Sequence, residues 1–157
     1  MRITDIILGT LQAMEDDPGC ALRSWQYNSK PLANVSLDRN KPSPTALALV
    51  ITDWELDLSK RNVVRESAEV SVTFLTVQRP PDRGMEPSDA DIITPMASLA
   101  AGFLSRLMEN RSIVIDGSSV SMRSVYDRSD SARSGVSVTL RIGERQGVCL
   151  DDFITGE

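Results

Sequence analysis

Residues 45–58 read TALALVITDWELDL and residues 68–78 read AEVSVTFLTVQ, and these two runs decide the fold. Large apolar residues recur at every second position in both runs, at 47, 49 and 51 in the first and at 70, 72 and 74 in the second, which is the pattern of β-strands. In the first run the alternation changes phase by one residue near Asp53, which predicts a bulge or a bend there. Residues 59–66 between the runs are polar, so we expect a connection there and an antiparallel pair of strands.

Two helices are predicted on either side of this pair. The first is expected over residues 3–15, because apolar residues recur there every three or four positions. The sequence DDPG at 16–19 should end it, since proline cannot continue the hydrogen-bond ladder. The same periodicity predicts a second helix over residues 95–109, whose start lies between Ser88 and Pro95 and whose end lies near Asn110, with Phe103 and Leu107 in the core.

The remaining sequence adds further strands. Residues 136–142 alternate strictly, and this is the clearest strand pattern in the chain. The apolar residues 113–115 precede Asp116-Gly117, a strong signal for a tight hairpin turn. Residues 23–27 and the tail 148–153, which holds Val148, Leu150 and Phe153, could each supply one more short strand.

Together these patterns predict an α+β fold. Because strands that are adjacent in sequence are joined by turns, we expect a mostly antiparallel sheet of about four to six strands with two main helices packed on one side. The length of 157 residues fits a single domain over 1–157. Loops rich in polar residues and proline are expected at 38–46, 79–91 and 127–135.

Composition excludes the commonest catalytic devices. The chain has no histidine, so Ser-His and Cys-His pairs cannot form. It has two cysteines, Cys20 and Cys149, for which two free thiols are favoured over a disulfide or a nucleophile. The first fifteen residues do not resemble a signal peptide, and no run approaches the roughly 18 apolar residues of a membrane span. We therefore expect a protein of the reducing cytoplasm with no membrane partner.

The charge balance points away from nucleic acid. With 22 acidic and 17 basic residues the chain has a net charge of −5, which argues against a protein that holds nucleic acid through a basic face. We expect no sequence-specific nucleic-acid partner. Fourteen of the 17 basic residues are arginine, which suits polar protein interfaces, although a coding preference for arginine explains it equally well.

Two groups of acidic residues could carry chemistry. Asp53, Glu55 and Asp57 alternate along one strand, and they form either a cation site or the solvated face of that strand. The second group precedes the second helix and consists of Glu86, Asp89 and Asp91. Acid at a helix N-terminus is favoured by the helix dipole, and the spacing lacks the calcium-loop pattern. We favour the structural explanation for both groups, and predict no metal, no cofactor and no enzymatic activity.

Two of the predicted loops are candidates for a subunit or partner interface. Both 79–91 and 127–135 mix arginine with acid, as polar interfaces do, although a solvated loop has the same composition. The candidate interface residues are Arg79, Asp82, Arg83, Arg128, Asp130 and Arg133.

The order of these elements resembles the small tail-completion proteins of tailed phages and prophages, the tail-terminator and head–tail joining group. The resemblance is carried by the opening helix 3–14, by ALALVITDWELDL at 46–58 and by AEVSVTFLTV at 68–77. The helix at 96–108 and the ending SVYDRSDSARSGVSVTLRI at 124–142 complete it.

This resemblance implies a structural role. Such proteins form a ring, commonly of six subunits, that stops polymerisation of the tail tube and offers a docking surface to the head or its connector. The implied partners are other copies of the chain, tail-tube proteins and head-connector proteins, first in the cytoplasm during assembly and then in the virion or prophage tail. The alternative is a small-molecule-binding or metal-dependent enzyme domain of the same α+β class that uses acidic residues such as Asp53 and Asp57.

Overall fold

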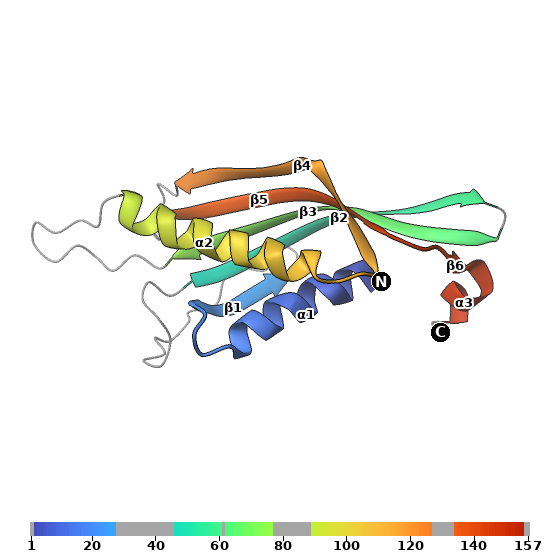
Figure 1. Ribbon diagram of the computed structural model, residues 1–157, viewed down its shortest axis with the longest axis horizontal. Coiled ribbons are helices and arrows are strands. Elements are labelled where there is room, and N and C mark those ends of the chain that lie inside the picture. Colours follow the sequence, from blue (N-terminus) through green and yellow to red (C-terminus); the bar gives the residue numbers. More distant parts are fainter. Residues whose placement is uncertain (1, 28–45, 61, 77–88, 127–133, 156–157) are drawn as a thin grey trace, which may run out of the picture.

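The computed structural model describes residues 2–27, 46–60, 62–76, 89–126 and 134–155. Three helices and six strands occupy these segments (Figure 1). In chain order they are α1 (Arg2–Asp16), β1 (Leu22–Tyr27), β2 (Ala46–Lys60), β3 (Val63–Thr76), α2 (Asp89–Met108), β4 (Ile113–Tyr126), β5 (Ser134–Glu144), β6 (Val148–Cys149) and α3 (Leu150–Thr155).

All six strands belong to one mixed sheet. The strand order is β1-β2-β3-β5-β4, and β6 pairs with β3 off this path. β1 runs parallel to β2, and every other pair of neighbours is antiparallel. The predicted α+β class, the mostly antiparallel sheet and the antiparallel pairing of the two alternating runs are therefore confirmed.

β2 and β3 form one long hairpin whose register shifts only near its tip, between Asp57 and Lys60. Pairing runs without a break from Ala46 opposite Thr76 to Asp57 opposite Arg65, so the predicted bulge near Asp53 is wrong. The apparent change of phase has a simple cause. The even-numbered residues of β2 face the helices throughout, while the leucines and the isoleucine before Asp53 lie on the other face with the acidic residues.

The predicted polar connection at 59–66 is also wrong. β2 continues to Lys60 and β3 begins at Val63, so most of that segment lies within the hairpin strands. Backbone hydrogen bonds hold a strand whatever the polarity of its side chains, so polar residues alone do not mark a turn. Asn62 adopts a φ of 65°, a left-handed conformation that asparagine tolerates better than most residues.

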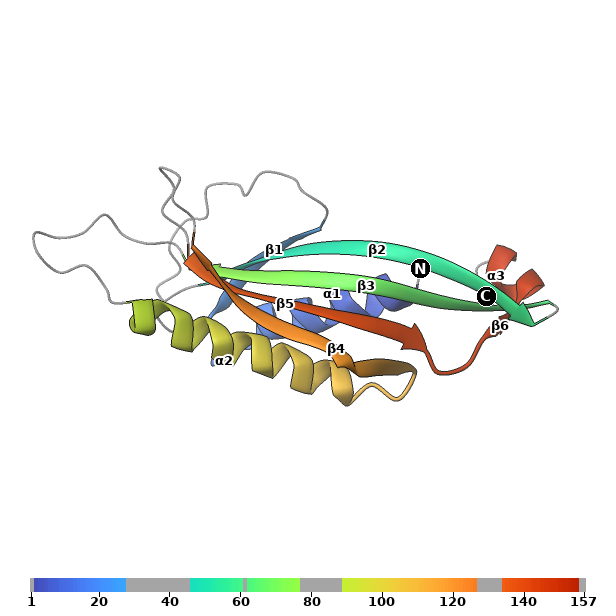
Figure 2. The same cartoon turned by 90° about the horizontal axis from the view of Figure 1, so that it is seen from above.

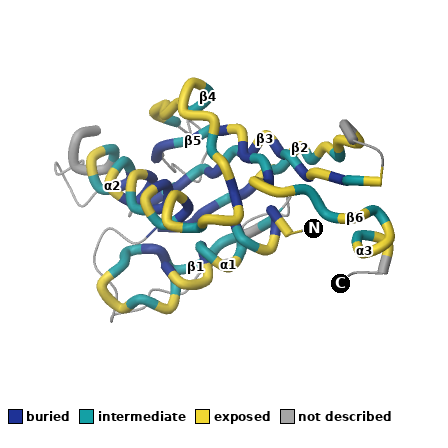
Figure 3. Tube along the Cα trace, turned by 45° about the vertical axis from the view of Figure 1, so that its right-hand side comes forward, coloured by how far each residue is buried: buried dark blue, intermediate teal, exposed yellow. Residues whose placement is uncertain are grey.

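α1 and α2 cover the same face of the sheet (Figure 2). Ile7 and Leu11 of α1 and Phe103 and Leu107 of α2 are fully buried there, which confirms the two predicted core residues of the second helix. The ring of Phe103 meets that of Phe74 from β3 edge to face, with 5.9 Å between the centroids. The buried segments in Figure 3 gather where these helices meet the sheet.

The helix bounds lie close to the prediction. α1 extends one residue beyond 3–15 at each end, and α2 ends at Met108. α2 begins at Asp89, within the predicted interval from Ser88 to Pro95, and contains Pro95. The acidic residues in its first turn favour a helix there through the dipole.

The predicted hairpin turn at Asp116-Gly117 is absent. β4 continues from Ile113 to Tyr126, and its pairing with β5 shifts between Asp116 and Ser121. Side chains hold this bulge: Asp116 Oδ1 accepts a hydrogen bond from the Ser118 N–H at 3.1 Å, and the Arg141 N–H donates to Ser119 Oγ at 2.8 Å. An aspartate that caps nearby backbone groups serves a bulge as well as a turn.

The predicted last strand is correct only at its start. Val148 and Cys149 pair with β3 as β6, but residues 150–155 form the short helix α3 and not a strand. The described segments thus hold three helices, with the two main ones, α1 and α2, on one face as expected. The last residues of the three predicted loops belong to helices or strands, because β2 begins at Ala46, α2 at Asp89 and β5 at Ser134, and the rest of each predicted loop lies outside the described residues.

The β2–β3 hairpin projects beyond α1 and α2 (Figure 1). We call its distal part the arm and define it as residues 55–60 of β2 with 63–67 of β3. β6 and α3 lie beside the arm, and they bury Val64 on its helix-facing side.

Candidate interaction surface

The six predicted interface residues, Arg79, Asp82, Arg83, Arg128, Asp130 and Arg133, lie outside the described residues. The strands that lead into their loops are described. Thr76 at the end of β3 pairs with Ser134 at the start of β5, and Ser134 pairs in turn with Tyr126 at the end of β4. Both predicted interface loops therefore leave the sheet at the same end, opposite the arm.

The face of the sheet away from α1 and α2, which we call the open face, is polar along its centre. Odd-numbered residues of β3 and β5 point to it, and a row of hydroxyl groups follows the two strands. Thr73 Oγ1 donates a hydrogen bond to Ser137 Oγ at 3.1 Å, and the hydroxyls of Ser71 and Ser137 lie 3.3 Å apart. Short hydroxyl side chains leave this surface flat.

Charged residues form one row across the open face. Pairing of the strands sets Asp53 of β2 opposite Glu69, Glu69 opposite Arg141, and Arg141 opposite Asp116 of β4. Three acids thus share one cation, and the direct opposition of Asp53 and Glu69 is unfavourable in the isolated subunit. Arg141 Nε lies 3.7 Å from Glu69 Oε2, and both side chains are more than half exposed.

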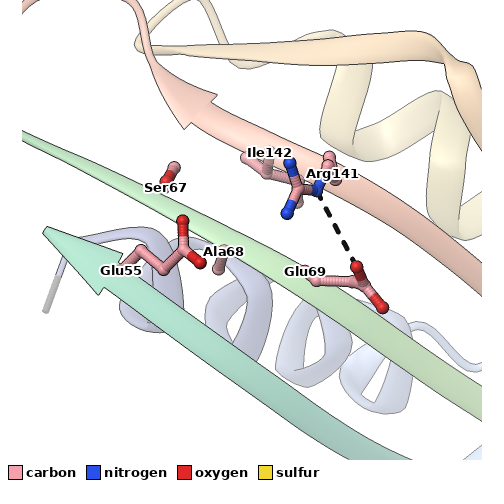
Figure 4. A pocket seen from close by; sticks show the side chains of 6 residues that line it. All are labelled: Glu55, Ser67, Ala68, Glu69, Arg141 and Ile142. Carbon is pink, nitrogen blue, oxygen red and sulfur yellow. Dashed lines mark ion pairs between the residues drawn. The ribbon is translucent and has the colours of Figure 1, made fainter. Parts of the chain in front are cut away.

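A shallow hollow lies beside this row (Figure 4). Its lining residues come from three strands and are Glu55, Ser67, Ala68, Glu69, Arg141 and Ile142. Glu55 and Glu69 are exposed to solvent, which weakens their interaction with any bound charge. The hollow offers carboxylates and one guanidinium, and its only hydroxyl, that of Ser67, has no histidine anywhere in the chain to activate it.

The three acidic residues of β2 lie where the solvated-face interpretation put them. Asp53, Glu55 and Asp57 are all exposed on the open face. Alternate residues of a strand are about 7 Å apart, so one strand alone does not bring three carboxylates onto one ion. Within the described part of the chain, no three His, Cys, Asp or Glu residues are grouped so that they could hold a metal ion. Asp89 and Asp91 fall in the first turn of α2.

A second acidic group was missed by the sequence analysis and is buried. Glu66 of β3 and Glu144 of β5 are 1% and 7% exposed. The Ile3 N–H at the start of α1 donates to Glu66 Oε2 at 3.3 Å, and the Glu66 N–H donates to Glu144 Oε1 at 2.9 Å. Arg2 completes the group by an ion pair with Glu144. These contacts fasten α1 to the sheet beside the arm.

One signal in the sequence could have revealed this group. The apolar alternation at 68, 70 and 72 continues backward to 66 with the same parity, which puts Glu66 on the helix-covered face. The interpretation of 59–66 as a polar connection hid that continuation.

Neither cysteine is part of a disulfide, and Cys20 is half-buried and Cys149 exposed. None of the helices in the described segments is both long and apolar enough to cross a membrane. Comparison of the chain with protein-family models and with curated proteins finds no match.

Proposed function

We propose that this protein is a structural subunit of a phage or prophage tail that assembles with copies of itself into a ring at the end of the tail tube. The observation that carries the proposal is the division of the sheet into one face covered by α1 and α2 and one face that is exposed from Ile51 toward the arm, beyond the buried Leu47. A two-layer domain buries its core with one face of its sheet, so the other face is available to a neighbouring molecule.

The arm supports the same role. The β2 strand of the arm buries little of its surface, since Glu55 and Asp57 are exposed and Leu58 near the tip is 55% exposed. An extension of this kind gains contacts when a neighbouring subunit packs against it. Ring assembly supplies such a neighbour on every subunit, because each copy offers two different patches to the next.

The charge of the open face agrees with a ring through which DNA passes. Its charged row holds three acids, Asp53, Glu69 and Asp116, against one cation, Arg141. Lysine and arginine hold the duplex by releasing its counterions, and an acid-rich surface lacks that attraction. A duplex would therefore slide past such a surface without being retained.

The test is an elongation assay with the tail-tube protein encoded in the same genome. Addition of the purified chain should stop growth of the tubes, and electron microscopy should show a cap of this protein at one end of each tube. Tubes that reach the same lengths with and without the chain, and that carry no density at their ends, would contradict the proposal.

A further inference from the structure

The sheet has an unpaired strand edge on each of two opposite sides. β4 forms one border, and no described strand pairs with its outer side. On the other side β1 covers β2 only from Ala46 to Val50. From Ile51 to Leu58 no described strand lies along the outer edge of β2. Each edge presents backbone N–H and C=O groups that another strand could pair with.

Exposed apolar side chains collect on the same two strands. Within the described segments six large hydrophobic side chains are exposed, and four of them belong to β2 or β4. Ile51 and Leu58 of β2 are 50% and 55% exposed, and Val114 and Met122 of β4 are 47% and 43% exposed. Apolar groups gathered beside free backbone edges mark a place where a further strand would bury them.

The second half of β4 lacks the usual protection of an edge strand. Edges are commonly blunted by charges, proline or a bulge. The bulge of β4 lies between Asp116 and Ser121, so residues 121–126 form an uninterrupted run with one charged residue, Arg123, and no proline. The free part of β2 carries the opposite charge, three acids on one face.

We propose that residues 121–126 of β4 in one subunit pair with residues 51–58 of β2 in the next, which joins the sheets of neighbouring subunits into one. The proposal rests on the proposed ring and names its interface. A ring requires two different patches per subunit, and these two edges are different, oppositely charged and on opposite sides of the sheet.

Strand direction and face are both compatible with this pairing. β2, β3, β5 and β4 alternate in direction, so β4 runs opposite to β2. Rotation about the ring axis preserves that relation, and the joint is therefore antiparallel. Arg123 pairs with Ser137 on the open face, the face that also carries the acids of β2. A continuous sheet brings Arg123 beside those carboxylates.

The stagger of the two segments also fits a closed sheet. Within one subunit Arg123 pairs with Ser137, Ser137 with Thr73, and Thr73 with Leu49. Arg123 and Leu49 therefore lie at the same position along the strands. It must therefore move four residues along the strands to meet Asp53, or six to meet Glu55, about 13–20 Å at 3.3 Å per residue. Four strands span about 19 Å across the sheet. The ratio of the displacement along the strands to the width of the four strands gives a strand tilt of about 35–46°. Strands in closed barrels tilt by roughly 35–45°.

Cysteine cross-linking tests this interface. In a background with Cys20→Ser and Cys149→Ser, one variant carries Arg123→Cys and Glu55→Cys. Within a subunit these positions are about 14 Å apart across the sheet, with two strands between them, and about 20 Å apart along the strands, so they cannot form a bond inside one chain. Mild oxidation of the concentrated protein should give a ladder of covalent oligomers on a denaturing gel.

The matched control replaces Arg123→Cys by Thr139→Cys, on the same face but one strand inward from the edge. We expect at least tenfold less cross-linked protein from the control than from the edge pair. Equal cross-linking in the two variants, while sedimentation shows oligomers, would overturn the edge pairing and leave the ring intact. Absence of oligomers both in concentrated solution and on tail tubes would overturn the ring and the interface together.

Discussion

The two halves of the β2–β3 hairpin belong to one antiparallel ladder, whose register is constant up to Asp57, but lie in different surroundings. In the proximal half Val50, Val72 and Phe74 are fully buried beneath α1 and α2. In the arm the residues of the same parity on β2 emerge step by step, since Leu56 is half-buried and Leu58 exposed. Alternation in sequence is similar in both halves, so it is the helices, and not the strands, that decide which apolar residues become core.

The two halves therefore contribute differently to the stability of the fold and to its assembly. The proximal half supplies the hydrophobic free energy that stabilises the fold, because burial of apolar surface is the dominant favourable contribution. The arm contributes little of that burial and presents charges and apolar side chains to the solvent. We therefore expect substitutions in the proximal half to have large effects on stability, and substitutions in the arm to have large effects on assembly.

The largest expected effect on stability follows truncation of the core aromatic. Phe103→Ala removes a ring that packs on Phe74 in the proximal half, and should lower the free energy of unfolding by about 3–5 kcal/mol. The matched change in the arm, Leu58→Ala, should stay within about 0.5 kcal/mol. Urea unfolding of both variants compares the halves directly. A similar loss in the two variants would contradict the division.

The next effect concerns the close approach of β3 and β5. A Cβ added at Gly135 would lie 1.7 Å from the carbonyl oxygen of Phe74, so Gly135→Ala must push the strands apart. We expect a loss of about 1–3 kcal/mol in unfolding free energy, or more. Gly143→Ala is the control, since a Cβ there meets no atom within 4 Å. Equal melting temperatures of these two variants would show that the strands are further apart than described.

A smaller effect is expected at the junction between the halves. Glu144→Ala removes the acceptor of the buried Glu66 N–H and the ion-pair partner of Arg2. Leaving that donor unpaired should cost about 1–3 kcal/mol in unfolding free energy. Glu69→Ala removes only an exposed ion pair, and should cost less than about 0.5 kcal/mol. Calorimetry of the two variants measures both values, and the reverse order would mean that the buried group does not hold α1.

The smallest effect on stability should accompany the largest effect on assembly. Replacement of Asp53, Glu55 and Asp57 together by serine removes exposed charges, so the unfolding free energy should change by no more than about 0.5 kcal/mol for each site. Self-association measured by sedimentation should fall at least tenfold, because the edge of β2 loses its attraction for Arg123. Unchanged association of this stable variant would mean that the acids are only a solvated face.

Sequence patterns predicted the individual helices and strands better than the pairing between strands. The stripe through Phe103 and Leu107 and the alternation at 136–142 were sufficient, because each reports a local period that a single element must satisfy. The bulge at Asp116 was mistaken for a turn, since aspartate and glycine serve both, and only pairing with β5 distinguishes them. Element type was thus predictable where local chemistry alone determines it.

The sequence was sufficient to predict which acidic residues of β2 share a face, but not how they are aligned with charged residues of other strands. Asp53, Glu55 and Asp57 share a face by the period of a strand, and that much needs no partner. Their alignment with Glu69, Arg141 and Asp116 depends on the registers of three strand pairs, which no local pattern encodes. The buried Glu66 was missed for the same reason, because its partner Glu144 lies 78 residues away in sequence.

The most direct test of the central claim, a self-assembling structural subunit, is the mass of the complex at the tube end. Native mass spectrometry of wild-type protein, both concentrated and released from tail tubes, should give one discrete multiple of the chain mass, as a closed ring requires. A monomer under every condition, or an open-ended series of masses, would contradict the account.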